Sequence, residues 1–386
     1  MPEFKEALPL SLYIHLPWCV KKCPYCDFNS HEFNGTELDE ENYIAALIRD
    51  LESELPRIWG RQISSIFIGG GTPSLFSAKA LDTLLAGIRA RLNHNPNIEI
   101  TLEANPGTAE ATKFYDYKQI GINRLSLCIQ SFNDAQLQAL GRFHDAEQVQ
   151  SAIELLKQSG FNNFNIDLMF GLPGQTLSEA MKDLRTAIEQ QPTHLSWYQL
   201  TIEPNTVFYA KPPVLPDDNV LWEIQESGQA CLSDAGYRQY EISAYATDKN
   251  ACKHNMNYWE FGDYLGIGAG AHGKLTQVAD ASIQRFKRHK MPARYMELAG
   301  TEHVITETKT LNKDDLSLEF MMNAMRLSAG IDIELFSQRT GLSLTIIDDR
   351  LAQAQQAGLI ENSVDMIKPT AKGLRYLNEL LEVFVQ

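Results

Sequence analysis

Three cysteines lie close together near the start of the chain, with a spacing that suits a metal-binding loop. They are Cys19, Cys23 and Cys26, in a C-x3-C-x2-C segment that follows a predicted strand. Thiolates are soft ligands that hold iron–sulfur clusters or zinc. A structural zinc ion takes four protein ligands, whereas a four-iron cluster held by these three thiolates keeps one iron open to a small molecule. The alternative is a zinc site completed by His15 or His31, which the specific three-cysteine spacing disfavours.

Further polar residues follow other predicted strands and could surround a small polar ligand. The segment Gly69-Gly70-Gly71-Thr72-Pro73 comes directly after the apolar residues 66–68, and glycines at a strand end let the backbone approach a ligand closely. No Gly-Lys-Ser/Thr follows, which excludes a phosphate-binding P-loop. Carboxylates and amides accept hydrogen bonds from an amine or from ribose hydroxyls, and a guanidinium pairs with a carboxylate. The residues of these kinds at or just after predicted strands are Glu103, Gln130, Arg142 and Asp167.

The three-cysteine loop resembles the signature of the radical S-adenosylmethionine superfamily. The resemblance implies a 4Fe–4S cluster on the three cysteines, whose open iron binds the amino and carboxyl groups of S-adenosylmethionine, and an electron donor that reduces the cluster. The other polar residues resemble the cofactor shell of the coproporphyrinogen-dehydrogenase-like branch, over nearly the whole chain. By that resemblance, the contacts of S-adenosylmethionine are Tyr13, Tyr25, Gly70, Gly71, Thr72, Glu103, Gln130, Arg142 and Asp167, with Thr201 as a further backbone contact.

Two groups of that branch are candidates. The oxygen-independent coproporphyrinogen III oxidases have a longer N-terminal extension and a fourth cysteine, C-x3-C-x2-C-x-C, where this chain has Phe28. The segment Cys26-Asp27-Phe28-Asn29-Ser30 instead resembles the HemW group, regarded as haem chaperones. That resemblance implies haem binding and transfer of haem to acceptor proteins, without coproporphyrinogen oxidase activity. The alternative is oxidative decarboxylation of a porphyrinogen, which starts with hydrogen abstraction from a propionate side chain.

The segment His254-Asn255-Met256-Asn257-Tyr258-Trp259 is an H-N-x-x-Y-W motif and the candidate haem-binding segment. Imidazole is a common axial ligand of haem iron, and aromatic rings can cover the porphyrin face. On residue types alone, a loop whose His and Asn make hydrogen bonds and whose aromatic rings are buried is the commoner case. The resemblance to the HemW group reverses this, so we expect His254 to bind haem. His272, in a glycine-rich turn, is a second candidate that ranks below it.

Apolar runs that alternate with helical patterns predict an α/β fold. Strands are predicted at 12–16, 64–68, 98–102, 125–129, 165–169 and 195–200. Helical spacing of apolar residues is found at 44–55, 78–92, 109–119, 146–158 and 177–190. Six strand–helix alternations require parallel pairing, in an α/β barrel or an open doubly wound sheet. With the family resemblance, the expected fold is a partial (β/α)6 TIM-like barrel of the radical S-adenosylmethionine type.

The rest of the chain divides into a less regular stretch and a separate C-terminal unit. A helix over 217–235 and an apolar run at 237–245 are followed by glycine-rich loops. Three short helices at 316–327, 333–338 and 346–357, a two-stranded wing of 359–360 with 366–367, and a last helix over 374–381 suggest a winged-helix-like α+β domain. The expected division is a radical S-adenosylmethionine core at 1–245, a haem- or substrate-binding extension and linker at 246–309, and the winged-helix domain at 310–386.

Composition limits the partners. The 386 residues include 34 Lys and Arg against 49 Asp and Glu, a formal net charge of −15. This balance argues against nucleic acid or an anionic membrane as partner, because either needs a cationic surface. The first residues do not resemble a signal peptide and no apolar run is long enough to cross a bilayer, so we expect a cytoplasmic protein. The expected partners are haem, haem-accepting proteins and the electron donor; the oligomeric state stays open, a homodimer included.

Overall fold

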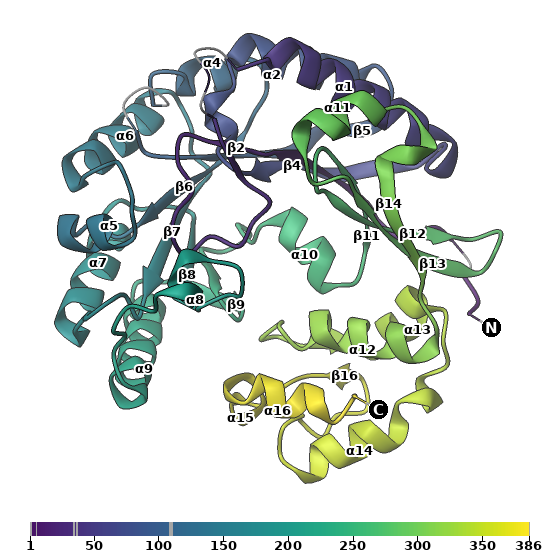
Figure 1. The fold of residues 1–386 in the computed structure, drawn as a ribbon. Helices are drawn as coiled ribbons and strands as arrows, with labels where there is room; N and C mark the ends of the chain where they lie inside the picture. The colour runs from purple at the N-terminus through teal and green to yellow at the C-terminus, as the bar shows by residue number, and fades with distance from the viewer. Residues whose placement is uncertain (1, 5, 34, 36–37, 108–110, 386) are drawn as a thin grey trace.

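A curved sheet of twelve strands forms the centre of the molecule in the computed structural model, which describes residues 2–4, 6–33, 35, 38–107 and 111–385 (Figure 1). Six neighbouring strands in the middle of this sheet are parallel. They are β1 (Leu10–Leu16), β4 (Gln62–Gly70), β5 (Asn93–Ala104), β6 (Arg124–Gln130), β7 (Phe164–Phe170) and β8 (His194–Gln199). The predicted partial (β/α)6 barrel is confirmed, and its sheet is open at both edges.

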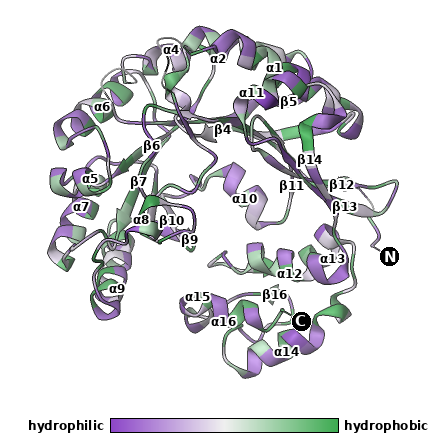
Figure 2. Ribbon diagram, in the orientation of Figure 1, coloured by the Kyte–Doolittle hydropathy of each residue, from purple (hydrophilic) through white to green (hydrophobic). Residues whose placement is uncertain are grey.

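Helices cover the convex face of the sheet and return the chain to the start of the next strand (Figure 1). Capping boxes begin two of them, at Asp145 and at Thr176, where each side chain accepts a backbone N–H of the first turn. In Figure 2 these helices carry hydrophobic and hydrophilic bands, as expected of helices with one face on a sheet. The helices are α1 (Glu40–Glu54), α2 (Ala78–Arg89), α4 (Phe114–Gln119), α5 (Asp134–Ala139), α6 (Ala146–Gln158), α7 (Leu177–Glu189) and α9 (Asp218–Asp234). Residues 109–110 of the predicted helix over 109–119 lie outside the described residues.

Six further strands extend the sheet at its two edges. Beside β1 lie β11 (Asp263–Ile267), which is parallel to it, and then β12 (His272–Gln277), β13 (Ser282–Arg288) and β14 (Ile305–Thr310). Beside β8 lie β10 (Ala244–Ala246) and β9 (Arg238–Glu241). The expectation of glycine-rich loops after residue 245 is wrong over β11–β14. Strands β12, β13 and β14 carry charged residues among their apolar ones, so they lack the apolar runs that mark the central strands.

The C-terminal unit has a hydrophobic core of its own, to which Phe261 and Ile283 of the preceding segment contribute. Its elements are α12 (Lys313–Ala324), β15 (Ile331–Asp332), α13 (Glu334–Thr340), α14 (Asp348–Gln356), β16 (Met366–Ile367), α15 (Ala371–Arg375) and α16 (Leu377–Glu382). The three predicted helices are confirmed. The predicted wing is only partly right, because β16 pairs with β15 whereas Ile360 meets Pro369 in a single bridge.

The concave side of the sheet faces this C-terminal unit, and the short helix α10 (Lys253–Trp259) lies between them (Figure 1). The remaining short elements are β2 (Trp18–Cys19), β3 (His31–Glu32), α8 (Val207–Ala210) and α11 (Pro292–Leu298). Within the described ranges, no helix combines the length and the apolar character that a membrane span requires.

Candidate functional site

The three cysteines lie on the loop that leaves β1. This loop is held at its base by the parallel pair of β2 and β3, in which Cys19 is opposite Glu32. Cys19 is buried, Cys23 and Cys26 are half-buried, and none of the three forms a disulfide. Burial raises the pKa of the Cys19 thiol, and the neighbouring thiols of Cys26 and Cys23 raise it further. The loop therefore carries three free thiols beyond β1, and their role as cluster ligands stays a prediction.

Of the two histidines that could complete a zinc site, His15 has both ring nitrogens in hydrogen bonds and His31 has one. In His15, Nδ1 lies 2.9 Å from the Tyr13 hydroxyl and Nε2 lies 2.8 Å from the Asn29 carbonyl. His31 Nε2 lies 3.1 Å from the Lys290 carbonyl. Among the described residues, no three Cys, His, Asp or Glu side chains surround a position for a single metal ion. Three thiols without a fourth protein ligand fit a cluster with one open iron better than a closed zinc site.

Arg142 connects the cysteine loop to the ends of the parallel strands. Its guanidinium donates to Cys23 Sγ at 3.6 Å, to Asn105 Oδ1 at 2.7 Å and to the Cys128 carbonyl. Its Nε is buried without a partner among the described residues. Burial of such a donor is costly unless a ligand accepts from it, so the guanidinium fits its predicted role toward a carboxylate.

The glycine-rich segment packs against β1 and the cysteine loop. Gly70 has φ +121°, and a Cβ at this position would lie 2.7 Å from the His15 ring. A Cβ on Gly71 would lie 2.5 Å from the Trp18 carbonyl oxygen. The Thr72 N–H donates to that same oxygen at 2.7 Å. The glycines are therefore required by close packing, which also exposes backbone groups at the end of β4.

Glu103 and Asp167 form the acidic part of the predicted cofactor shell. Glu103 Oε2 accepts the Gly70 N–H at 3.0 Å. Burial raises the pKa of Glu103 to about 8, with a further contribution from the Asp167 charge. Asp167 accepts from the Ser126 hydroxyl at 3.0 Å and from Asn165 Nδ2 at 2.8 Å, and burial raises its pKa as well. A bound cationic amine would favour the ionised form of both carboxyl groups.

Two residues outside the predicted cofactor shell complete the connections within it. Asn105 Nδ2 donates to Thr72 Oγ1 at 3.1 Å, while its Oδ1 receives Arg142. The Tyr198 hydroxyl donates to Gln130 Oε1 at 2.8 Å. Both follow the rule that chemistry lies at the carboxyl ends of the parallel strands, so strand position could have found them. Thr201 lies beyond β8 and is exposed.

His254 lies in the first turn of α10 and is buried. Its Nδ1 is 3.0 Å from the Ser65 hydroxyl, and its Nε2 is 2.9 Å from the Tyr258 hydroxyl. Burial lowers the pKa of the imidazole to about 3, so the ring is neutral. The Glu99 carboxylate accepts the Lys253 N–H at 2.9 Å and thereby holds the start of α10. The structure thus places the aromatic residues of the motif, Tyr258 and Trp259, nearer to open space than the histidine.

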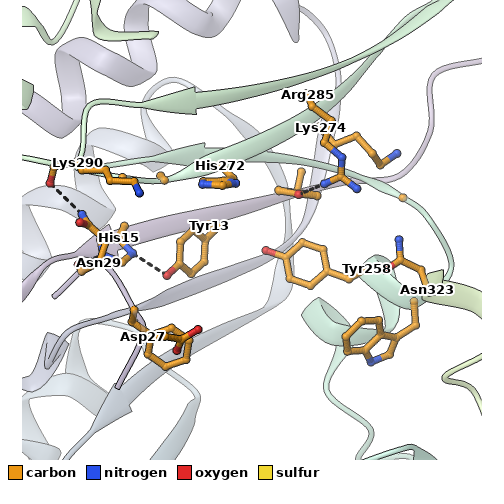
Figure 3. A pocket seen from close by; sticks show the side chains of 16 residues that line it. Tyr13, His15, Asp27, Asn29, Tyr258, His272, Lys274, Arg285, Lys290 and Asn323 are labelled. Carbon is orange, nitrogen blue, oxygen red and sulfur yellow. Dashed lines mark hydrogen bonds between the residues drawn. The ribbon is translucent and has the colours of Figure 1, made fainter. Parts of the chain in front are cut away.

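A pocket of about 420 Å³ opens between the cysteine loop, β12, β13 and the motif helix (Figure 3). This volume is within the range of small-molecule and cofactor sites. Its lining combines aromatic rings with three cations and one carboxylate. The aromatic and charged residues are Tyr13, His15, Phe28, Tyr258, Trp259, Tyr264, His272, Lys274, Arg285, Lys290 and Asp27. Lys274 and Arg285 were missed because they belong to the strands that the sequence pattern did not reveal.

Comparisons with known proteins agree with the fold and identify the family. A model of the radical SAM superfamily matches residues 13–187, and a model of the HemN C-terminal domain matches residues 311–376. The proteins named "Heme chaperone HemW" from Haemophilus influenzae and from Escherichia coli are 52% and 48% identical to the chain, each match covering 98% of both proteins. The structure of coproporphyrinogen III oxidase (HemN) from Escherichia coli superposes with a TM-score of 0.81 at 24% identity, over 100% of this chain and 91% of that one.

At 24% identity the last comparison shows the fold alone, whereas the first two relatives are similar over nearly their full length. The chain therefore belongs to the HemW group of the radical S-adenosylmethionine superfamily.

Proposed function

We propose that this protein binds haem and transfers it to acceptor proteins, while it carries a 4Fe–4S cluster and binds S-adenosylmethionine. The observation that carries the proposal is the near full-length similarity to relatives that are named heme chaperones. The pocket beside the cysteine loop supports it, because aromatic rings and cations suit a flat ligand that bears carboxylates.

The residues present fit both predicted cofactors. Cys19, Cys23 and Cys26 would hold the cluster, which supplies one-electron chemistry when bound. Arg142, with its unpartnered Nε, would hold a carboxylate close to Cys23. The carboxyl groups and amides at the ends of β5, β6 and β7 would accept hydrogen bonds from an amine and from ribose hydroxyls. The protein's part is to orient S-adenosylmethionine, whether or not the cofactor is turned over.

His254 belongs to the proposed haem site. Its imidazole has both nitrogens in hydrogen bonds and is separated from the pocket by the Tyr258 ring, which lines it. Loss of His254 would therefore free the Tyr258 hydroxyl and alter the pocket wall. Reduced haem binding is expected in a His254→Ala variant, whether the histidine ligates iron itself or acts through Tyr258.

Oxidative decarboxylation of a porphyrinogen is the alternative that the sequence raises, and no observation favours it. Phe28 occupies the position of the oxidases' fourth cysteine and lines the pocket with its exposed ring. The structural similarity to the oxidase shows a shared fold and gives no evidence of oxidase activity in this protein.

The test is to load the anaerobically purified protein with haem and mix it with an apo haem protein such as apomyoglobin. We expect a Soret band on loading and its replacement by the acceptor's spectrum after mixing. The same protein is then given coproporphyrinogen III, S-adenosylmethionine and a reductant. Absence of haem binding, together with release of carbon dioxide from the porphyrinogen, would overturn the proposal.

A further inference from the structure

His272, which lines the pocket, differs in its hydrogen bonds from His15, which also lines it, and from the nearby His254. His15 and His254 each have both ring nitrogens within hydrogen-bond distance of a partner. His272, at the start of β12, is exposed and lines the pocket. Neither of its ring nitrogens has a hydrogen-bond partner among the residues that the structure describes. A metal ligand needs a nitrogen lone pair that is not already engaged, and His272 offers one.

The charges around His272 keep its ring in the form that binds a metal. Partial desolvation of the ring lowers the pKa of His272, and the nearby cations of Lys287, Arg285 and Lys290 lower it further. The Glu307 carboxylate acts in the opposite direction but does not reverse the shift. The imidazole is therefore neutral at pH 7, which is the form that ligates iron.

Three cations line the pocket, and one of them is available to a carboxylate. Arg285 is paired with Glu319 at 2.5 Å, and Lys274 is paired with Asp263 at 3.3 Å. The Lys290 ammonium has no such partner within the described part of the chain. In a protein with a net charge of −15, a pocket with three cations and only one lining carboxylate is a distinct feature.

The aromatic residues give the pocket the shape of a site for a flat ligand. In Figure 3, His272 lies above the rings of Tyr13 and Tyr258, with Lys290 on one side and Arg285 and Lys274 on the other. The Tyr258 hydroxyl is fixed by His254 Nε2 at 2.9 Å. The motif histidine thus holds a ring that faces the ligand space.

We propose that this pocket is where haem binds, that His272 is the ligand of its iron, and that Lys290 meets a propionate. The inference rests on the proposed function, since it names the site at which haem is held. His254 is then a positioning residue, which acts on the haem through Tyr258. An exposed ligand in an open pocket also suits a protein that must release its haem to another.

The experiment is a haem titration of the full-length protein, followed by the Soret band and by electron paramagnetic resonance of the ferric iron. Five proteins are compared: wild type, His272→Ala, His254→Ala, Lys290→Gln and His303→Ala. His303 is exposed, with 74% of its side chain accessible, and does not line the pocket, so its variant is the matched control. Circular dichroism establishes that each variant is folded.

We expect His272→Ala to raise the Kd for haem at least tenfold and to lose the imidazole-type spectrum, and added free imidazole to restore that spectrum. The His254→Ala variant should bind more weakly but keep the wild-type ligand spectrum. The dimethyl ester of haem should bind wild type at least tenfold more weakly than haem, and this difference should shrink in Lys290→Gln.

The inference is overturned if wild type binds haem and His272→Ala gives the same Kd and spectrum, or if imidazole rescues His254→Ala instead. An ester that binds as tightly as haem would overturn the role of Lys290. If wild type itself binds no haem, the proposed function fails, which is a separate result from the failure of His272 as ligand.

Discussion

Two half-buried carboxyl groups, Glu103 of β5 and Asp167 of β7, lie on the two strands that flank β6, and desolvation raises the pKa of both. When one of two interacting carboxyl groups is ionised, ionisation of the second costs additional free energy unless a cation binds beside them. A ligand amine would supply that cation, with the Gly70 N–H already bound to Glu103. The free energy needed to ionise Glu103 should therefore lower the stability of the ligand-free protein at a pH where Glu103 is charged.

Glu103→Gln should make the ligand-free protein more stable than wild type at alkaline pH. The folded-state pKa of Glu103, about 8, lies above the ordinary value of 4.5, so its favourable contribution is complete below pH 4.5 and is lost as the pH rises through 8. The expected gain at pH 9 is on the order of 3–5 kcal/mol at most. Urea unfolding at pH 5 and pH 9 measures it, with the exposed Glu302→Gln as control. Equal differences from wild type at both pH values would contradict the assignment.

At the scale of single residues, the sequence predicts the donors but not how they are connected. Cys19, Cys23 and Cys26 are recognisable because their spacing is local. Asn105 and Tyr198 were not among the predicted cofactor contacts, because their hydrogen bonds to Arg142 and Gln130 join distant segments, and such contacts have no signature within one segment. The hydrogen bonds of His254 likewise depend on Ser65, which is distant in sequence.

Helix α10 shows how an element sets the pocket wall. It is only seven residues long, so its own hydrogen bonds cannot hold it in place. Glu99 of β5 accepts the N–H groups of Lys253 and His254 at its start, at 2.9 and 3.4 Å. The position of Tyr258 one turn later therefore depends on a carboxylate from a central strand.

Glu99→Ala should loosen α10 and weaken haem binding without touching the pocket lining. Loss of the acceptor at the helix start should reduce the free energy of unfolding by about 1–2 kcal/mol. The buried Arg124 charge loses a nearby carboxylate in the same variant, which adds to the loss. Denaturant unfolding and a haem titration of the same preparation are the measurements. A variant with lower stability but an unchanged Kd for haem would show that haem binding does not depend on the position of α10.

The central elements were predictable and the edge elements were not, for a physical reason. Strands β1 and β4–β8 are covered on both faces, so they read as apolar runs with helices between them. Strand β14 is exposed along nearly all its length and β13 has charged residues on one face. Their pairing is determined by the neighbouring strand rather than by their own composition.

At the scale of the whole molecule, the C-terminal unit is attached to the barrel by polar contacts at several places. Arg326 pairs with Glu241 at 2.8 Å, and Arg285 of β13 pairs with Glu319 of α12 at 2.5 Å. The Arg375 guanidinium lies 3.3 Å from the centre of the Trp222 ring. Asn323 of α12 reaches the pocket lining, so this unit closes one side of the site.

Arg326→Ala should loosen the C-terminal unit and speed the release of haem. The Glu241 side chain is only 3% exposed and would lose its cation, although the half-exposed arginine limits the effect to about 1–3 kcal/mol. Limited proteolysis near residue 311 and the rate of haem transfer to apomyoglobin are the readouts. Arg294→Ala, which breaks the exposed pair with Glu297, is the matched control. Equal cleavage and transfer rates in the two variants would refute the coupling.

The pocket itself could not be predicted from the sequence, because it is assembled from three distant segments. Tyr13 and Phe28 come from the first strand and the cysteine loop, Tyr258 and His272 from the extension, and Asn323 from the C-terminal unit. Motifs predict what each segment can bind. Only the folded sheet shows that they face a common space.

The most direct measurement counts non-haem iron, labile sulfide and haem on one sample of the reconstituted, haem-loaded protein. The proposed sites are separate, so we expect four non-haem irons, four sulfides and one haem per chain at the same time. Replacement of all three loop cysteines by serine should remove the irons and sulfides. Haem that binds only when the cluster is lost, or iron and sulfide that remain in the serine variant, would contradict the account.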